Sequence, residues 1–271
     1  MRLAGREVGG IGLGTAQFAF RERSRAESIA TVHAALDAGV RLIDTALAYT
    51  RGDAESYAEE VVAAALRSWT HESPVVATKG GHFRRADAFP VDGSPAALRA
   101  HCEISLRTLG VDRIDLYQLH HVDPAIPLVE SVGALVQLRE EGKVGEIGLS
   151  NVDVGQLDLA RGIGPIASVQ NRLSLTQASD LPMVHACAER GVAYLAYMPF
   201  GGPGGPITPA AQRIALARAV SPQQVMLGWL RAQSAVVLPL VGASRAETIV
   251  DSARLIDLDP GELAALSALA R

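Results

Sequence analysis

The feature that most constrains the fold is a regular alternation of short β-rich runs with longer helical segments. Four of the helical patterns end at a glycine that precedes a strand-like run, namely Gly39, Gly110, Gly142 and Gly191. Glycine ends helices because, without a Cβ, it adopts a left-handed backbone at little energetic cost. Each of these glycines therefore predicts where a helix ends and the next strand begins.

The alternation continues along the chain and predicts a barrel. Strict alternation implies a parallel sheet with right-handed crossovers, which either closes into a (β/α)8 barrel or stays open and doubly wound. Eight units in 271 residues, without a break in composition, favour a single α/β TIM barrel domain over residues 1–271, with a short N-terminal hairpin as a possible addition. No Gly-x-Gly-x-x-Gly follows the first run, which argues against a Rossmann domain. The eight strand-like runs are residues 11–14, 41–44, 74–78, 114–119, 146–149, 166–170, 193–197 and 235–238.

The composition excludes several classes of protein. With 48% hydrophobic and 20% charged residues, the chain can bury a large core and is neither disordered nor collagenous. The net charge of −4 leaves no basic surplus for nucleic acid or an anionic membrane. No stretch approaches the roughly 20 apolar residues of a membrane helix, and the first residues lack an apolar signal-peptide core. Cys102 and Cys187 form no disulfide framework, so a cytoplasmic location is expected.

Polar residues stand where the predicted strands end. In a barrel of this kind the loops after the strands converge at one face and carry the chemistry. Asp44 ends the second run and Tyr49 follows it, while Lys79 and His120 end the third and fourth. A lysine near a phenol lowers the tyrosine pKa, an aspartate holds the lysine, and a histidine can orient a carbonyl oxygen. Together they predict that Tyr49 protonates a carbonyl oxygen as hydride reaches the carbon, and a nicotinamide must supply the hydride because no side chain is a reductant.

At these residues the sequence resembles the aldo-keto reductase family. The matching segments occur in order over nearly the whole chain, from Gly10 to about Ala253. Each segment is weak evidence alone, but the ordered set is specific and implies a barrel with carbonyl reductase activity. The segments are residues 41–49 (RLIDTALAY), 77–79 (ATK), 115–120 (DLYQLH), 148–151 (GLSN), 170–171 (QN), 196–201 (AYMPFG) and 239–244 (PLVGAS).

The resemblance also implies site residues and a cofactor. Asp44, Tyr49, Lys79 and His120 match the family's catalytic tetrad, with Tyr49 as the proton donor. Tyr197 matches the aromatic residue that stacks on the nicotinamide ring. The implied cofactor is NADPH/NADP+, with NADH as an alternative, and no metal is expected. The residues expected to contact the cofactor are Gly14, Thr15, Asp44, Ser150, Asn151, Gln170, Tyr197, Pro199, Phe200, Gly201, Gly242, Ser244, Arg245 and Thr248.

Two parts of the sequence depart from the family pattern. Arg245 is the one cation in segment 242–248, where many NADPH-preferring members have a lysine and an arginine, so we expect it alone to bind the 2′-phosphate. Ala16 stands where members often have an aromatic residue, and His121 where many have tryptophan. With aromatics at 4% of residues, a polar pocket with an open rim is expected. The residues expected to line it are Phe18, His82, Phe83 and His121.

Other functions are compatible with parts of this pattern. A nicotinamide-binding sensor or regulatory protein with little turnover would keep the cofactor site, and a dedicated sugar or secondary-metabolite ketoreductase would differ only in its substrate. A metal-dependent hydrolase is disfavoured, because the histidines form no His-x-His pair and Lys79 would disfavour a metal. The expected partner is a small-molecule carbonyl substrate, with no nucleic acid and no membrane, and the expected assembly is a monomer or a weak homo-oligomer.

Overall fold

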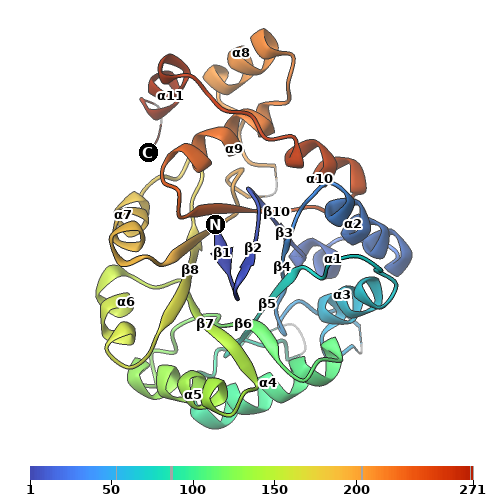
Figure 1. Ribbon diagram of the computed structural model, residues 1–271, viewed down its shortest axis with the longest axis vertical. Coiled ribbons are helices and arrows are strands. Elements are labelled where there is room, and N and C mark those ends of the chain that lie inside the picture. The colour runs from blue at the N-terminus through green and yellow to red at the C-terminus, as the bar shows by residue number, and fades with distance from the viewer. Residues whose placement is uncertain (53, 86–87, 203, 269, 271) are drawn as a thin grey trace.

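The structure is a computed structural model that describes residues 1–52, 54–85, 88–202, 204–268 and 270. Eight parallel strands close into a barrel in the order β10-β3-β4-β5-β6-β7-β8-β9 (Figure 1). The barrel closes where β10 pairs with β3, with Gly242 opposite Gly14 in register. This confirms the expected (β/α)8 barrel and rules out the open sheet. The barrel strands are β3 (Gly12–Gly14), β4 (Leu42–Asp44), β5 (Val75–Gly80), β6 (Ile114–Leu119), β7 (Val144–Ser150), β8 (Ile166–Arg172), β9 (Ala193–Tyr197) and β10 (Val237–Gly242).

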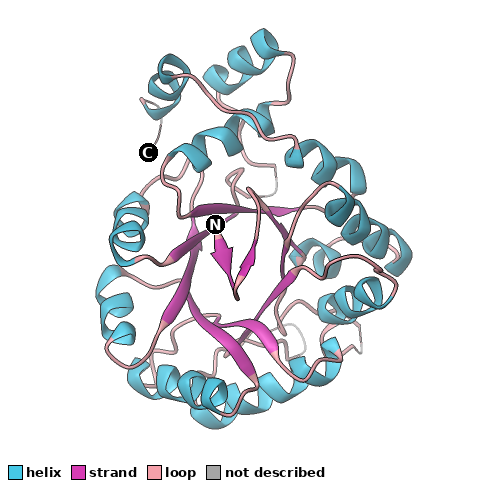
Figure 2. Ribbon diagram, in the orientation of Figure 1, coloured by secondary structure: helices cyan, strands magenta, loops and turns pink. Residues whose placement is uncertain are grey.

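Helices surround the barrel on its outside (Figure 2). Two of them, α8 and α11, lie beside each other beyond this ring, joined by an ion pair of 2.6 Å between Arg218 and Glu262 (Figure 1). Of the helices described, none is long and apolar enough to cross a membrane. The helices are α1 (Ala16–Phe20), α2 (Arg25–Asp37), α3 (Tyr57–Arg67), α4 (Pro95–Leu109), α5 (Leu128–Glu140), α6 (Val154–Arg161), α7 (Leu181–Arg190), α8 (Pro209–Arg218), α9 (Pro222–Ala232), α10 (Ala246–Ala253) and α11 (Pro260–Ser267).

A short antiparallel hairpin closes the N-terminal end of the barrel. Its strands are β1 (Arg2–Leu3) and β2 (Arg6–Glu7), and it lies across the barrel opening in the view of Figures 1 and 2. Leu3 is buried in the apolar cluster that fills the barrel interior, and Arg6 forms an ion pair of 2.5 Å with Asp115 near the start of β6. The expected N-terminal hairpin is therefore confirmed, and it leaves the other end of the barrel for a site.

The helix ends follow from the local sequence. Gly39, Gly110, Gly142 and Gly191 all have left-handed backbones, with φ angles of 88°, 70°, 79° and 64°. A side chain with a Cβ would be strained at these turns, so glycine lets each helix stop and the chain re-enter the barrel. These sharp reversals set the length of each unit and thereby bring the strand ends to one face.

Candidate active site

A buried ion pair lies at the C-terminal mouth of the barrel. Asp44, the last residue of β4, and Lys79, on β5, have side chains that are 5% and 0% exposed. Lys79 Nζ donates to Asp44 Oδ2 over 2.7 Å and to the carbonyl oxygen of Thr45 over 2.9 Å. Burial by itself lowers the pKa of Lys79, but Asp44 and Tyr49 favour the charged form more strongly, so this pKa is raised. Lys79 is therefore a fixed cation.

The second oxygen of Asp44 is held by amides from two other strands. Gln170 Nε2 on β8 donates to Asp44 Oδ1 over 2.8 Å, and Gln118 Nε2 on β6 approaches the same oxygen at 3.4 Å. Both glutamines are buried, and both face the barrel interior. The sequence interpretation missed Gln118. Its signal is a polar side chain between Tyr117 and Leu119 near the end of the strand, two positions before His120.

Tyr49 follows β4 and reaches the same ion pair. Its hydroxyl lies 3.4 Å from Lys79 Nζ, and the ammonium group lies 5.0 Å from the ring centroid. Burial raises the pKa of Tyr49, and the nearby Lys79 lowers it by a smaller amount, so the pKa remains above its usual value. The expected effect of the lysine is present but is outweighed by desolvation. The phenol is therefore protonated at neutral pH and can donate a proton.

His120, directly after β6, completes the expected group of four. Its ring lies edge-on to Tyr49, with centroids 5.7 Å apart. Burial lowers the pKa of His120 well below its usual value, and the charge of Lys79 lowers it further, followed by His121 and His82. The imidazole is therefore neutral. Asp44, Tyr49, Lys79 and His120 thus lie together at the mouth of the barrel.

Three histidines form one wall beside Tyr49. The ring centroids of His82, His120 and His121 are separated by 4.9 to 5.0 Å. Burial lowers the pKa of His82 and of His121 as well, so all three rings favour the neutral form. Across the described ranges, no group of three or more His, Cys, Asp or Glu side chains is arranged to hold a metal ion.

Aromatic residues form a second wall of the site. The residue of α1 that belongs to it is Phe20, two positions after the expected Phe18. Phe18 is fully buried in the apolar core and offers no exposed surface to a substrate, which corrects the sequence expectation. Phe20, at the end of α1, lies 6.1 Å from the Tyr49 ring and 6.0 Å from Phe89. Phe20 and Phe89 remain 50% and 39% exposed, so the rim is more apolar than the composition predicts. Phe83 packs against His101 of α4, at 5.3 Å between ring centroids.

The residues expected to hold the nicotinamide lie at the ends of β7, β8 and β9. Tyr197 donates through its hydroxyl to Asn151 Oδ1 over 2.7 Å. Asn151 Nδ2 donates to the carbonyl oxygen of His120 over 3.0 Å and to Ser150 Oγ over 3.1 Å. Asn151 has a left-handed backbone with φ of 58°, a conformation that asparagine tolerates better than most residues. These bonds join the expected cofactor residues to the histidine of the tetrad.

Asn171 hydrogen-bonds the backbone next to Asn151, and the sequence analysis assigned it no role. Its side chain accepts from the amide of Val152 over 3.2 Å and donates to the carbonyl of Val152 over 2.8 Å. It thereby fixes the backbone directly after Asn151, as a paired strand would. The signal in the sequence is its position next to Gln170, since neighbouring residues of a strand face opposite sides.

The remaining expected cofactor residues border the seam where the barrel closes. Thr15 donates through both its amide and its hydroxyl to the carbonyl oxygen of Asp44, at 2.9 and 3.0 Å. Gly201, in the loop after β9, has φ of 82°, and Met198 in the same loop has φ of 51°. Arg245 is exposed at the N-cap position of α10, where no side chain caps the helix. Gly14 and Gly242 end β3 and β10, Thr248 lies in the first turn of α10, and the loops hold Pro199, Phe200 and Ser244.

Comparison with known proteins identifies the family. A sequence model of the aldo/keto reductase family matches residues 10–209. The chain belongs to this family. It is 29% identical over 231 residues to an uncharacterised oxidoreductase of Schizosaccharomyces pombe, covering 83% of this chain and 72% of that protein. This confirms the family expected from the ordered segments and makes the protein a member of an oxidoreductase family.

Solved structures of aldo-keto reductases share the whole fold. An aldo/keto reductase of Klebsiella pneumoniae in complex with NADP and acetate superposes with a TM-score of 0.81 at 29% identity, covering 97% of this chain and 92% of that one. A thermostable aldo-keto reductase in complex with the inhibitor epalrestat gives a TM-score of 0.86 at 24% identity, covering 99% and 98%. The second similarity concerns the fold alone.

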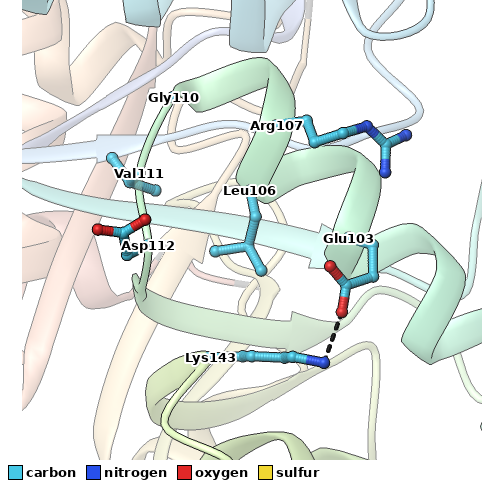
Figure 3. Close-up of a pocket in the computed structure, with 7 residues that line it drawn as sticks. All are labelled: Glu103, Leu106, Arg107, Gly110, Val111, Asp112 and Lys143. Carbon is cyan, nitrogen blue, oxygen red and sulfur yellow. Dashed lines mark ion pairs between the residues drawn. The ribbon is translucent and has the colours of Figure 1, made fainter.

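A surface groove of this aldo-keto reductase lies at the other end of the barrel. It has a volume of about 430 Å³ and lies where the chain turns from α4 into β6 (Figure 3). Two of its charged side chains are paired with each other, since Lys143 contacts Glu103 at 2.6 Å, and Lys143 also contacts Glu141 at 3.1 Å. The groove contains none of the tetrad residues, which lie at the opposite mouth of the barrel. It is lined by Glu103, Leu106, Arg107, Gly110, Val111, Asp112 and Lys143.

Proposed function

We propose that this aldo-keto reductase transfers hydride from NADPH to an aldehyde or ketone, with Tyr49 as the proton donor. The observation that carries the proposal is the chain of contacts from Asp44 through Lys79 to the Tyr49 hydroxyl, with the neutral His120 ring beside it. These are the groups that a carbonyl reduction needs for its proton. The reaction is reversible, since the same hydroxyl can take the proton back.

The residues at the mouth fit a nicotinamide dinucleotide. The amide Nε2 of Gln170 is committed to Asp44, which leaves its carbonyl oxygen to accept from a carboxamide, beside Ser150 and Asn151. Tyr197 is only partly buried, and its hydroxyl bond to Asn151 holds the ring in place for stacking. When bound, the cofactor supplies hydride, a reductant that no side chain provides. Gly14, Thr15, Pro199, Phe200, Gly201, Gly242, Ser244 and Thr248 would line the rest of the dinucleotide.

The side chains divide the work of proton transfer. Tyr49 is protonated at neutral pH and so donates to a carbonyl oxygen as negative charge develops there. His120, as a neutral ring, hydrogen-bonds the same oxygen and orients it. Lys79 stabilises the phenolate that remains on Tyr49, and Asp44 keeps Lys79 in place. Desolvation strengthens each of these interactions, since a low dielectric weakens screening.

The preference for NADPH over NADH rests on the start of α10. A helix N-terminus favours an anion and disfavours a cation, yet Arg245 stands there without a side-chain cap or a carboxylate partner among the described residues. A 2′-phosphate would satisfy both the guanidinium and the free amides of the first turn. Glu247 in that turn is the one nearby charge that would oppose the phosphate.

His82, Phe83 and His121 are proposed as pocket residues, with Phe20 in place of Phe18. We also propose one domain over residues 1–271, as a monomer or a weak homo-oligomer. A cytoplasmic location is proposed on the two free buried thiols, Cys102 and Cys187.

The experiment tests a panel of aldehydes, ketones, pyridoxal and keto-sugars with NADPH. Turnover is measured as the loss of nicotinamide absorbance. Turnover of at least one carbonyl that disappears in Tyr49→Phe, with cofactor binding retained, supports the proposal. Tight NADPH binding without oxidation of the cofactor by any substrate would instead identify a sensor. A single strongly preferred keto-sugar would identify a dedicated ketoreductase.

A further inference from the structure

Arg172 stands at the mouth of the barrel beside the proposed nicotinamide site. It is the last residue of β8, and the preceding residues of the same parity, Ser168 and Gln170, face the barrel interior, where they contact Gln118 and Asp44. Side chains alternate along a strand, so Arg172 belongs to the same face of β8 as Gln170, two residues nearer the mouth of the barrel. The register of the sheet places it directly opposite Tyr197 of β9.

The guanidinium of Arg172 contacts the loop that leaves β9. Arg172 Nη2 donates to the carbonyl oxygen of Gly201 over 3.0 Å. Gly201 and Gly202 have left-handed backbones with φ of 82° and 109°, and a Cβ on Gly202 would lie 3.6 Å from the same Nη2. The side chain therefore lies along a turn that a bulkier sequence could not form. It ties the end of β8 to the loop proposed to bind the pyrophosphate.

Arg172 keeps most of its hydrogen-bonding capacity. A guanidinium has five N–H donors, and its bond to Gly201 is the one that the described residues provide. By contrast, Arg190 is bound by both carboxylate oxygens of Asp158, and Arg218 by both oxygens of Glu262. Arg172 is thus an exposed cation beside the loop after β9, without a carboxylate partner in the described part of the chain.

Neither lysine of the chain serves this position. Lys79 is bound to Asp44, and Lys143 lies at the opposite end of the barrel with Glu103. Burial raises the pKa of Tyr197 and the charge of Arg172 partly offsets this, which places the positive charge close to the proposed stacking ring. A dinucleotide whose nicotinamide stacked on Tyr197 would have its pyrophosphate within reach of the loop after β9, where Arg172 contacts Gly201.

We propose that Arg172 binds the pyrophosphate of the dinucleotide while it tethers the turn at Gly201. This rests on the proposed function and adds a second phosphate-binding arginine to Arg245. A guanidinium suits this role because its donors are arranged as a fork that matches phosphate oxygens. Since the pyrophosphate is common to both cofactors, Arg172 contributes equally to NADPH and NADH, whereas Arg245 distinguishes them.

The test is the dissociation constant of each cofactor, measured by fluorescence titration without substrate. In Arg172→Ala we expect about 10- to 100-fold weaker binding of both NADPH and NADH, as for loss of a charge-assisted contact. Binding of adenosine 2′-monophosphate, which lacks a pyrophosphate, stays unchanged. Arg139→Ala is the matched control, since Arg139 Nε also donates to a glycine carbonyl, that of Gly145 at 3.1 Å, but at the other end of the barrel.

Two conservative variants separate the phosphate contact from the tether. Arg172→Lys keeps the charge and should recover part of the lost affinity, while Arg172→Gln keeps a donor for Gly201 without charge and should recover less. Full recovery by glutamine, unchanged affinity in Arg172→Ala, or a loss confined to NADPH would each overturn the inference. If the unmodified protein bound neither cofactor, the proposed function would fail and this inference with it. If Arg139→Ala lost as much cofactor affinity as Arg172→Ala, the loss would reflect general destabilisation of the protein and would overturn the inference.

Discussion

Gln170 donates through Nε2 to Asp44 Oδ1 over 2.8 Å, so one carboxylate joins the residues proposed for proton transfer to the strand proposed to hold the nicotinamide. The other oxygen of Asp44 accepts from Lys79 over 2.7 Å. Asp44 therefore orients the cation and the amide at the same time. A change at either partner should be detectable at the other.

Gln170→Leu should destabilise the protein and weaken cofactor binding together. It removes the shorter of two amide contacts to a buried carboxylate, a loss of about 1–3 kcal/mol in the free energy of unfolding. Denaturant unfolding and an NADPH titration measure the two effects. Gln118→Leu is the matched control because the Gln118 amide is 3.4 Å from the same oxygen. This variant should lose less free energy of unfolding and less NADPH affinity than Gln170→Leu. A larger loss in Gln118→Leu would mean that the distances do not rank the contacts.

Lys79→Met should be among the most destabilising substitutions at the mouth. It leaves Asp44 buried without its cation, and breaking a buried pair from one side costs about 3–5 kcal/mol. In Lys79→Met combined with Asp44→Asn, both charges are absent, so part of the stability should return. Unfolding free energies of the two single variants and the double variant form the cycle. Strict additivity would argue against direct coupling between the two residues.

The fold could be predicted from the sequence because helix-ending glycines and the alternation of helical and strand-like segments depend on neighbouring residues. Left-handed glycines such as Gly110 and Gly191 are favoured where helices end, and their spacing indicates where the units begin. Closure of the barrel then follows from pairing β10 with β3. The hairpin at Arg2–Glu7 is held by the distant Asp115, a contact that no local pattern contains.

The site was predicted less completely, because its supporting contacts come from different strands. The four tetrad residues were assigned by residue type and order, and they do lie together. Gln118 and Asn171 were missed, since their roles depend on which partner faces them across the barrel. Phe18 was placed wrongly because α1 is one short helix, and two positions along it separate the core from the rim.

The two directions of the reaction should respond differently to pH. The pKa of Tyr49 is raised above its usual value of about 10, so the phenol is protonated throughout the neutral and mildly alkaline range. Carbonyl reduction needs that proton and should be flat over this range. Alcohol oxidation needs the ionised form, so its kcat should rise with pH, about tenfold per pH unit below that pKa. Tyr49→Phe should show no turnover in either direction at any of these pH values, and a flat profile for oxidation in the unmodified protein would contradict the assignment.

The two cysteines should be unreactive in the folded protein. Burial raises the pKa of both Cys102 and Cys187 to about 12, and the thiolate is the reactive form. A thiol reagent at mildly alkaline pH should therefore modify neither residue until denaturant is added. Ser179→Cys, at an exposed position, provides a thiol that reacts under the same conditions. Rapid labelling of the unmodified protein without denaturant would show that its core opens far more often than the burial implies.

Arg245→Ala should separate the two cofactors. Arg245 lies at the uncapped start of α10, so its guanidinium and the first amides favour an anion at this end of the helix. The substitution should weaken the binding of NADPH by about 10- to 100-fold, the range for one charge-assisted contact. The affinity for NADH should change by no more than about twofold. Arg254→Ala, which alters the opposite end of the same helix, should leave both unchanged. Equal weakening of NADPH and NADH would remove Arg245 from the 2′-phosphate site and leave Arg172 as the better-supported phosphate contact.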